Sequence, residues 1–553
     1  MPKQGIVIYQ KKKFFVKEIT MKKALAMILA LVMVCSFFSA IASAEPAMAK
    51  EQIYYEAVTK ASQGESSFVT TTAHRLDATV NQPGVAMGWN GELKNLLVES
   101  YEMEENGKVW ILHIRPDAKW HDGEDVVAED FIWSYSAWAN PRVATRWNGK
   151  ASSILGYAEV QAGDTDTLSG VTKIDDKTVR VELSTAVPLW MRIEQVYLVI
   201  FPYHYFKDVK PEDVVADNFW KARIGTGPFK YSEYVPDQYI RLDRNEEYYD
   251  GPAILETIYY VIYENAASML NAYASGEIQT TFYEGTSIVP DDRDFYAGLE
   301  NHVVVTMDKG SASAIVLNFK DEDWSKKEIR QALMYALDVD TMLANLYPGA
   351  VKALDIFPQS WAHADDLNPY DYNPELAKEL IDSVGYSGKT HILYYAMTDQ
   401  TIINLLQACQ QYWAAVGIKV ELQYLDAAGT TELNTSDRID MLLNGTGMSL
   451  DPSLAETGLK TGEMLAYNYS NPRVDELFAL GKQYSEVEDR AAYYQEISKI
   501  INEDAVRCWL WYDIRDLGFS ENVIGPKEHF AEQGSILFNM GVYNEIEKWY
   551  IAE

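Results

Sequence analysis

The sequence holds few groups that are arranged for catalysis. Its eight histidines are scattered, and no two of them have the spacing of metal ligands on one helix. His121 is followed by Asp122 and Gly123, a base beside an acid, but Asp-Gly after a strand is more often a turn. The sequence contains no P-loop, dinucleotide fingerprint, nucleophile elbow or HExxH motif. We therefore expect no enzyme, no cofactor and no metal. A secreted hydrolase with an acidic pair is the competing class, because carboxylates are abundant.

Charge and cysteine content exclude further classes of function. The 553 residues include 81 Asp and Glu against 48 Lys and Arg, so the chain lacks the cationic surface that nucleic acids need. Three cysteines are too few for a disulfide scaffold or a four-thiolate zinc site. The 14 tryptophans and 37 tyrosines point elsewhere, because aromatic rings stack on sugars and line peptide clefts.

One long apolar segment covers residues 24–44 and ends in Ala-Ser-Ala. A short cationic stretch that starts at Met21 precedes it. This order is typical of a secretory signal peptide. We predict that residues 1–44 are an N-terminal extension and signal, and that the mature protein is extracytoplasmic. An uncleaved anchor helix is the alternative, and lipidation of Cys35 is disfavoured because Val34 before it is not small. Cleavage would remove seven lysines and one glutamate and leave a net charge of −39.

Strands and helices are mixed along the chain, so we predict an α/β fold with roughly two to four domains. Alternation of apolar residues predicts strands at 110–114, 179–183 and 258–262. Helical spacing predicts helices after residue 325, from 374 to 384 and from 402 to 416. Ser325 and Glu328 have the spacing of a capping box, and Asn373 precedes Pro374 as an N-cap. Cys409 lies on the apolar stripe of the last helix, where packing is its expected role.

Seven sequence blocks, in this order, resemble the signature segments of one family. The first runs from Trp110 through the turn at His121 to a helix start at Ala128-Glu129-Asp130. The others are GTGPFK at 225–230, RNEEYY at 244–249, SGEI at 275–278, IRQALMYALD at 329–338, YDYNPELAK at 370–378 and YSNPRVD at 469–475. Together they resemble the extracytoplasmic solute-binding proteins of ABC importers, in the oligopeptide, dipeptide and nickel family (family 5).

The resemblance implies a two-lobed fold of the class II periplasmic binding proteins, with a solute cleft between the lobes. It implies a discontinuous lobe I from 45–90, 215–310 and 520–553, an extra small domain inserted at 91–214, and lobe II from 311–519. It also implies that the family's first strand, before residue 54, is absent or altered here. Most signature residues should be structural, because they supply turns, caps and strand ends. These are Arg115, His121, Asp122, Gly123, Gly225, Gly227, Asn245, Gly276, Glu277 and Arg330.

The segment 444–452 resembles the family's ligand region. Peptide-binding members carry an aspartate just upstream of an acidic-Pro pair, and this aspartate binds the ammonium group of the peptide. Asp451-Pro452 matches the pair, but the upstream position holds Met448 or a neighbour. The resemblance implies ligand contacts from Asn444, Thr446, Met448 and Asp451. Two roles remain for Asp451, an anchor for the ligand or the N-cap of a helix. Two roles also remain for Met448, contact with the ligand or packing within the protein.

The resemblance therefore implies a receptor, expected to be a monomer, that delivers a solute to the permease and ATPase subunits of an ABC importer. A peptide is the expected solute. An oligosaccharide is the alternative, because aromatic residues are abundant and the ammonium anchor is missing. Nickel is the third candidate, since no cluster of His or Cys is visible for its ligation.

Overall fold

A computed structural model describes residues 47–59, 66–68, 74–88, 92–145, 148–281, 288–289, 292–357, 359–397, 399–434, 438–447, 451–528 and 539–553. The predicted signal segment, 1–44, lies outside these residues. Residues 51–551 form one compact unit. Across the described ranges, every helix is too short or too polar to cross a membrane.

A four-stranded sheet contains the first strand of the chain. Its order is β1 (Ile53–Thr59), β10 (Thr257–Tyr263), β9 (Tyr239–Arg244) and β8 (Phe229–Val235), and β1 runs parallel to β10. The predicted strand at 258–262 is confirmed, with buried residues at every second position of β10. The resemblance implied that the family's first strand is absent or altered, and the structure shows a strand, β1, at the start of the described chain. Tyr54 to Ala57 lie in this strand, and Tyr54, Ala57 and Val58 are buried in the core.

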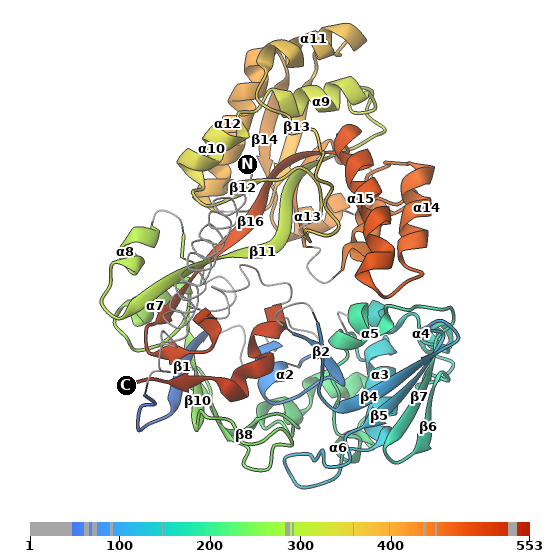
Figure 1. Cartoon of the computed structure of the whole chain (residues 1–553), viewed down its shortest axis with the longest axis vertical. Helices are drawn as coiled ribbons and strands as arrows, with labels where there is room; N and C mark the ends of the chain where they lie inside the picture. Colours follow the sequence, from blue (N-terminus) through green and yellow to red (C-terminus); the bar gives the residue numbers. More distant parts are fainter. Residues whose placement is uncertain are drawn as a thin grey trace, which may run out of the picture. The chain divides into compact units, whose positions relative to one another are not determined.

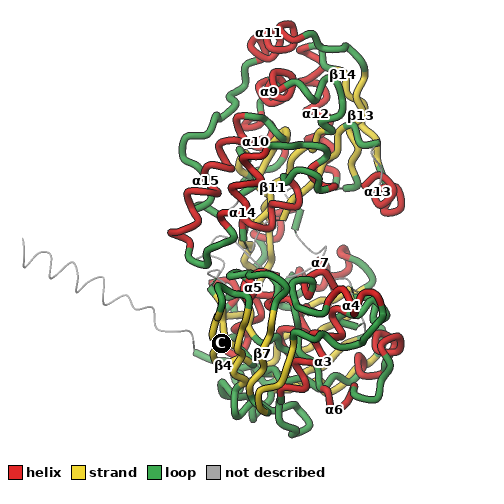
Figure 2. The backbone as a smooth tube through the Cα atoms, turned by 90° about the vertical axis from the view of Figure 1, so that its right-hand side faces the viewer, coloured by secondary structure: helices red, strands yellow, loops and turns green. Residues whose placement is uncertain are grey.

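A second, antiparallel sheet has the order β4 (Val98–Glu104), β5 (Val109–Ile114), β7 (Thr178–Glu182) and β6 (Val171–Asp175). It contains the strands predicted at 110–114 and 179–183, although β7 ends one residue early. Helix α3 (Ala128–Ala139) begins at the predicted Ala-Glu-Asp and packs on this sheet (Figure 2). The core of this region also includes Phe68, Val85 and Met87 before residue 91, and Phe219 and Trp220 after residue 214. The packing thus extends beyond the range predicted for the inserted domain.

A third sheet of six strands forms the core of the second half of the chain. Its order is β12 (Val351–Lys352), β16 (Arg507–Ser520), β11 (His302–Leu317), β15 (Met441–Gly447), β13 (Thr390–Tyr395) and β14 (Lys419–Tyr424). Helices that contribute to its buried core are α9 (Lys327–Tyr335), α10 (Val339–Leu346), α11 (Pro374–Val384), α12 (Gln400–Val416), α14 (Pro472–Gly481) and α15 (Val487–Glu503). Cys409 and Cys508 lie in this core as free, buried thiols, so packing is the role that the structure shows for Cys409.

The ends of these helices follow local sequence signals in two cases of three. The Asn373 side chain accepts a hydrogen bond from the Leu376 amide (3.0 Å), and α12 ends at Gly417 with a φ of 98° that favours glycine. The predicted capping box is wrong. Helix α9 begins after Lys326, and the Ser325 hydroxyl donates instead to the carbonyl of Glu322 (2.9 Å).

Strands β11 and β16 run side by side over most of their length (Figure 1). Residues 302–308 pair with 514–520, residues 312–316 pair with 507–512, and a bulge shifts the register between the two stretches. Residues 311–317 of β11, after the bulge, also pair with β15. Residues 518–520 of β16, which pair with β11 before the bulge, bond to residues 279–281. The two long strands therefore have different outer neighbours on the two sides of the bulge. The lobe boundaries predicted at 310 and 519 stay predictions.

The remaining elements are short. They are α2 (His74–Thr79), β2 (Val85–Met87), β3 (Leu93–Asn95), α4 (Tyr157–Ala162), α5 (Trp190–Ile193), α6 (Tyr203–Phe206), α7 (Ala266–Ala274), α8 (Arg293–Ala297), α13 (Ala427–Asn434), β17 (Val523–Ile524) and β18 (Tyr550–Ile551).

Candidate functional site

The predicted ligand segment begins in strand β15, whose pairing differs on its two sides. Residues 441–447 pair antiparallel with β11. On the other side, the pairing with β13 that the structure describes covers only Met441 and Leu442. Among the described residues, the main chain from Leu443 to Gly447 is therefore paired as a strand on the β11 side only. Asn444 is half-buried in this stretch; the side chain of Thr446 and all of Met448 lie outside the described residues.

Polar side chains gather on one face of the sheet beside this stretch. Ser311 and Ser313 of β11 donate to opposite oxygens of the Asp513 carboxylate of β16, at 2.6 and 2.7 Å. The indole of Trp511 donates to the same carboxylate at 2.9 Å. Gly445 is exposed, and a Cβ atom on it would lie 3.6 Å from Asp513 Oδ2. No motif predicts this face; its signal in the sequence is a lone acid inside the apolar run 508–514.

Asp451 is held by protein groups from two elements. Its carboxylate accepts from the Ser453 amide (2.9 Å) as the N-cap of the short helix Pro452–Gly458. The guanidinium of Arg490 binds both carboxylate oxygens, at 2.6 and 2.7 Å, and the two side chains are 1–2% exposed. Burial alone would lower the pKa of Arg490, but the hydrogen bonds and the charge of Asp451 raise it. These contacts support the N-cap interpretation of Asp451 over that of a ligand anchor.

The histidine of the first signature block lies between two glycines of the second. The Gly225 amide donates to His121 Nδ1 (3.1 Å), and His121 Nε2 lies 3.0 Å from the carbonyl oxygen of Gly227. Burial lowers the pKa of His121 to about 4, so the ring is neutral at pH 7, with Nδ1 as acceptor and Nε2 as donor. Asn245 donates to the same Gly227 carbonyl (3.2 Å). Through its two bonds to Gly225 and Gly227, His121 thus joins two turns that are about 100 positions apart in the chain.

The other signature residues also contact the protein's own groups. Arg115 donates to the Leu96 carbonyl (2.6 Å), and Arg330 donates to the carbonyls of Trp324 (2.8 Å) and Asp504 (2.7 Å). The rest occupy turns or bond to neighbouring side chains: Asp122 with His204 at 2.8 Å, Glu277 with Tyr263 at 2.9 Å, Gly123 at a φ of 96° and Gly276 at a φ of 77°. These residues lie where the chain turns or where elements meet, and the structural role expected of them stays a prediction that these contacts support.

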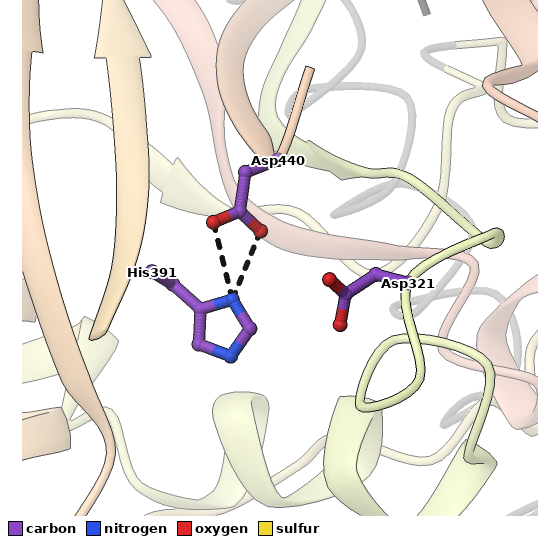
Figure 3. Close-up of side chains that lie close together, drawn as sticks. All are labelled: Asp321, His391 and Asp440. Atoms are coloured by element: carbon purple, nitrogen blue, oxygen red, sulfur yellow. Dashed lines mark hydrogen bonds and ion pairs between the residues drawn. The ribbon is translucent and has the colours of Figure 1, made fainter. Parts of the chain in front are cut away.

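Asp321, His391 and Asp440 lie close enough together to be considered as a metal site (Figure 3). Their potential ligand atoms lie within 4.8 Å of one another. These atoms already have protein partners: His391 Nδ1 lies 2.9 Å from Asp440, its Nε2 lies 3.2 Å from Asp323, and Asp321 pairs with Lys389. Although burial alone would raise the pKa of Asp440, hydrogen bonds led by that from His391 lower it. A metal ion would have to displace these partners, so the group is better described as a closed ionic network.

Two α/β regions that share a pair of long strands define the class of two-lobed periplasmic binding proteins, and solved structures have the same fold. The substrate-binding protein CtaP of an ABC transporter from Listeria monocytogenes superposes with a TM-score of 0.76 at 21% identity, over 92% of this chain and all of that one. The oligopeptide-binding protein AppA of Bacillus subtilis, in complex with a nonapeptide, superposes with a TM-score of 0.70 at 22% identity, over 92% of this chain and all of that one.

The family follows from the sequence match. Residues 92–461 match the model described as bacterial extracellular solute-binding proteins, family 5 Middle, and the chain belongs to this family. The curated sequence of Bacillus subtilis AppA is 24% identical over 485 residues, which is 83% of this chain and 84% of that protein. The resemblance inferred from the seven blocks is thereby confirmed.

Proposed function

We propose that this protein is an extracytoplasmic receptor that binds peptides in a cleft between its lobes and delivers them to the permease of an ABC importer. It belongs to a family of extracellular solute-binding proteins, and its relative AppA is an oligopeptide-binding protein. Such a receptor acts by binding, not by turnover, and its two lobes close on the solute. We expect it to work as a monomer.

The single observation that carries the choice of a peptide is the edge of β15 that no strand of the described residues covers beyond Leu442. The main chain of residues 443–447 pairs with β11 on one side, and pairing with β13 stops at Leu442. An extended peptide can add to such an edge through main-chain hydrogen bonds, which give affinity for many sequences. An oligosaccharide has no main chain that could continue the strand. Nickel would need ligands, and in the one candidate cluster among the described residues the His391 ring and its neighbouring carboxylates are already bound to one another.

The experiment is thermal unfolding of the exported protein with pools of peptides, oligosaccharides and nickel. A ligand at a hundred times its dissociation constant should stabilise by about 2.7 kcal/mol. We expect peptides to shift the transition, and peptides N-methylated at alternate positions to lose the shift when they cannot donate to the strand edge. Stabilisation by oligosaccharides or nickel, with none by any peptide, would overturn the proposal.

A further inference from the structure

A cavity lies in the region of helices α3 and α6, which pack against each other (Figure 2). Its volume is about 370 Å³, within the range of small-molecule sites. Its lining residues all come from positions 129–214, which belong to the range predicted as the inserted domain. The cavity wall contains none of residues 443–447, so it is built without the strand edge to which a peptide is proposed to add.

One part of the cavity wall is apolar. Trp133 and Val143 line it from α3 and the turn after it, and Val209 and Val214 line it from the segment after α6. The Trp133 ring stacks on Phe206, with ring centroids 4.6 Å apart and planes at 12° to each other. Phe206 thus covers one face of the indole and fixes its orientation, and only the other face or the edge can line the cavity. Such a wall suits a flat, apolar group.

The charged side chains in the wall differ in whether the protein pairs them. Glu129 forms an ion pair with Lys173 at 2.8 Å. Asp166 forms an ion pair with Arg142. Lys207 lines the same cavity, and among the described residues its side chain has neither an ion pair nor a hydrogen bond. The two acids are therefore already paired, and the ammonium group of Lys207 is the charge that the protein leaves available.

Several uncharged groups of the wall also have hydrogens to donate. Ser136 is 4% exposed, and its hydroxyl oxygen accepts a hydrogen bond from the Leu168 amide (3.1 Å). The hydroxyl hydrogen of Ser136 has no acceptor among the described residues. The indole N–H of Trp133, which can only donate, and the hydroxyl of Tyr203 likewise have no described acceptor. A ligand that complements this wall brings acceptor atoms and a negative charge.

We propose that the cavity binds a small amphipathic carboxylate, with its apolar ring against Trp133 and its carboxylate at Lys207. A carboxylate offers two oxygens that together accept several hydrogen bonds, and bonds between charged partners are stronger than neutral ones. Burial of the apolar ring adds to the affinity. The inference goes beyond the proposed function and does not depend on it, because the site shares no residue with the peptide edge of β15.

The test labels the exported protein with fluorotryptophan and follows the fluorine NMR signal of Trp133, which is assigned through Trp133→Phe. The probes are indoleacetate and its neutral analogue indoleacetamide. Indoleacetate should shift the Trp133 signal saturably, with a dissociation constant of about 1 mM or tighter for a ligand of this size. The amide should bind at least about fivefold more weakly, because its bond to the ammonium group lacks the negative charge. No shift of the Trp133 signal up to about 10 mM indoleacetate, or equal affinities for the two probes, would overturn the assignment.

Two lysine variants separate the charge from other effects of the probe. Lys207→Gln changes an exposed side chain, so it should keep the melting temperature and abolish the preference for indoleacetate over the amide. Lys221→Gln is the matched control, because this lysine is also exposed, has no described ion pair and does not line the cavity. The control should keep the preference. A preference that survives Lys207→Gln, or one that Lys221→Gln removes to the same extent, would contradict the proposal.

Discussion

Substitution of Asp451 by asparagine should reduce the stability of the protein without changing its affinity for peptides. The carboxylate binds Arg490 through two hydrogen bonds of 2.6 and 2.7 Å, and both side chains are at most 2% exposed. Asparagine still caps the helix through its oxygen to the Ser453 amide, so the cap contributes little to the loss. The guanidinium, however, loses its counter-charge in a buried place, which costs about 3–5 kcal/mol.

The measurement is urea unfolding followed by tryptophan fluorescence, with two companion variants. Adding Arg490→Met to Asp451→Asn removes both charges and should recover part of the loss, because a neutral buried pair has no stranded ion. The control is Arg473→Met, which breaks an ion pair with Glu496 in which both side chains are 44% exposed, and it should cost at most about 1 kcal/mol. An Asp451→Asn protein that is within about 1 kcal/mol of the wild type, but binds peptides much more weakly, would refute the reasoning and restore Asp451 as the anchor.

Three further predictions concern stability and reactivity. Burial lowers the pKa of His121 from 6.5 to about 4. The contribution of the neutral ring to the unfolding free energy is therefore complete above pH 6.5, and it falls by up to about 3 kcal/mol as the pH drops towards 4. His121→Gln should flatten this part of the pH dependence of the unfolding free energy. Gly225→Ala would place a methyl group on the carbonyl oxygen of Val80 and should cost more than about 2 kcal/mol in urea unfolding, whereas Gly149→Ala, which faces open space, should change stability by less than about 0.5 kcal/mol. Burial raises the pKa of Cys409 to about 12, so neither buried thiol should react with a thiol reagent in the native protein, and both should react in urea.

The parts of the fold that follow from the sequence are those set by neighbouring residues. Asn373 and Gly417 mark helix ends because a cap or a left-handed backbone needs only the adjacent turn. The alternation of β10 predicts its strand because one face of the sheet is buried. Ser325 shows the limit of such signals, since its hydroxyl bonds backwards to Glu322 and the helix begins one residue later than the capping box predicts.

The site depends on residues that meet only after folding. Ser311 and Asp513 are 202 positions apart in the chain, and a bulge in β11 sets their register. No spacing rule connects them, and Asp513 in isolation is one acid among 81 acidic residues. The family blocks predict the fold and the segment at 444–452, but not the carboxylate that lies beside that segment.

The buried acids of this protein differ in the groups that hold them. Asp451 is neutralised by a guanidinium, and Asp440 lies against the His391 ring within a closed network. Both arrangements are complete without a ligand, and removing either partner leaves a stranded charge. Asp513 differs from both, because its donors are neutral and no side chain among the described residues forms an ion pair with it.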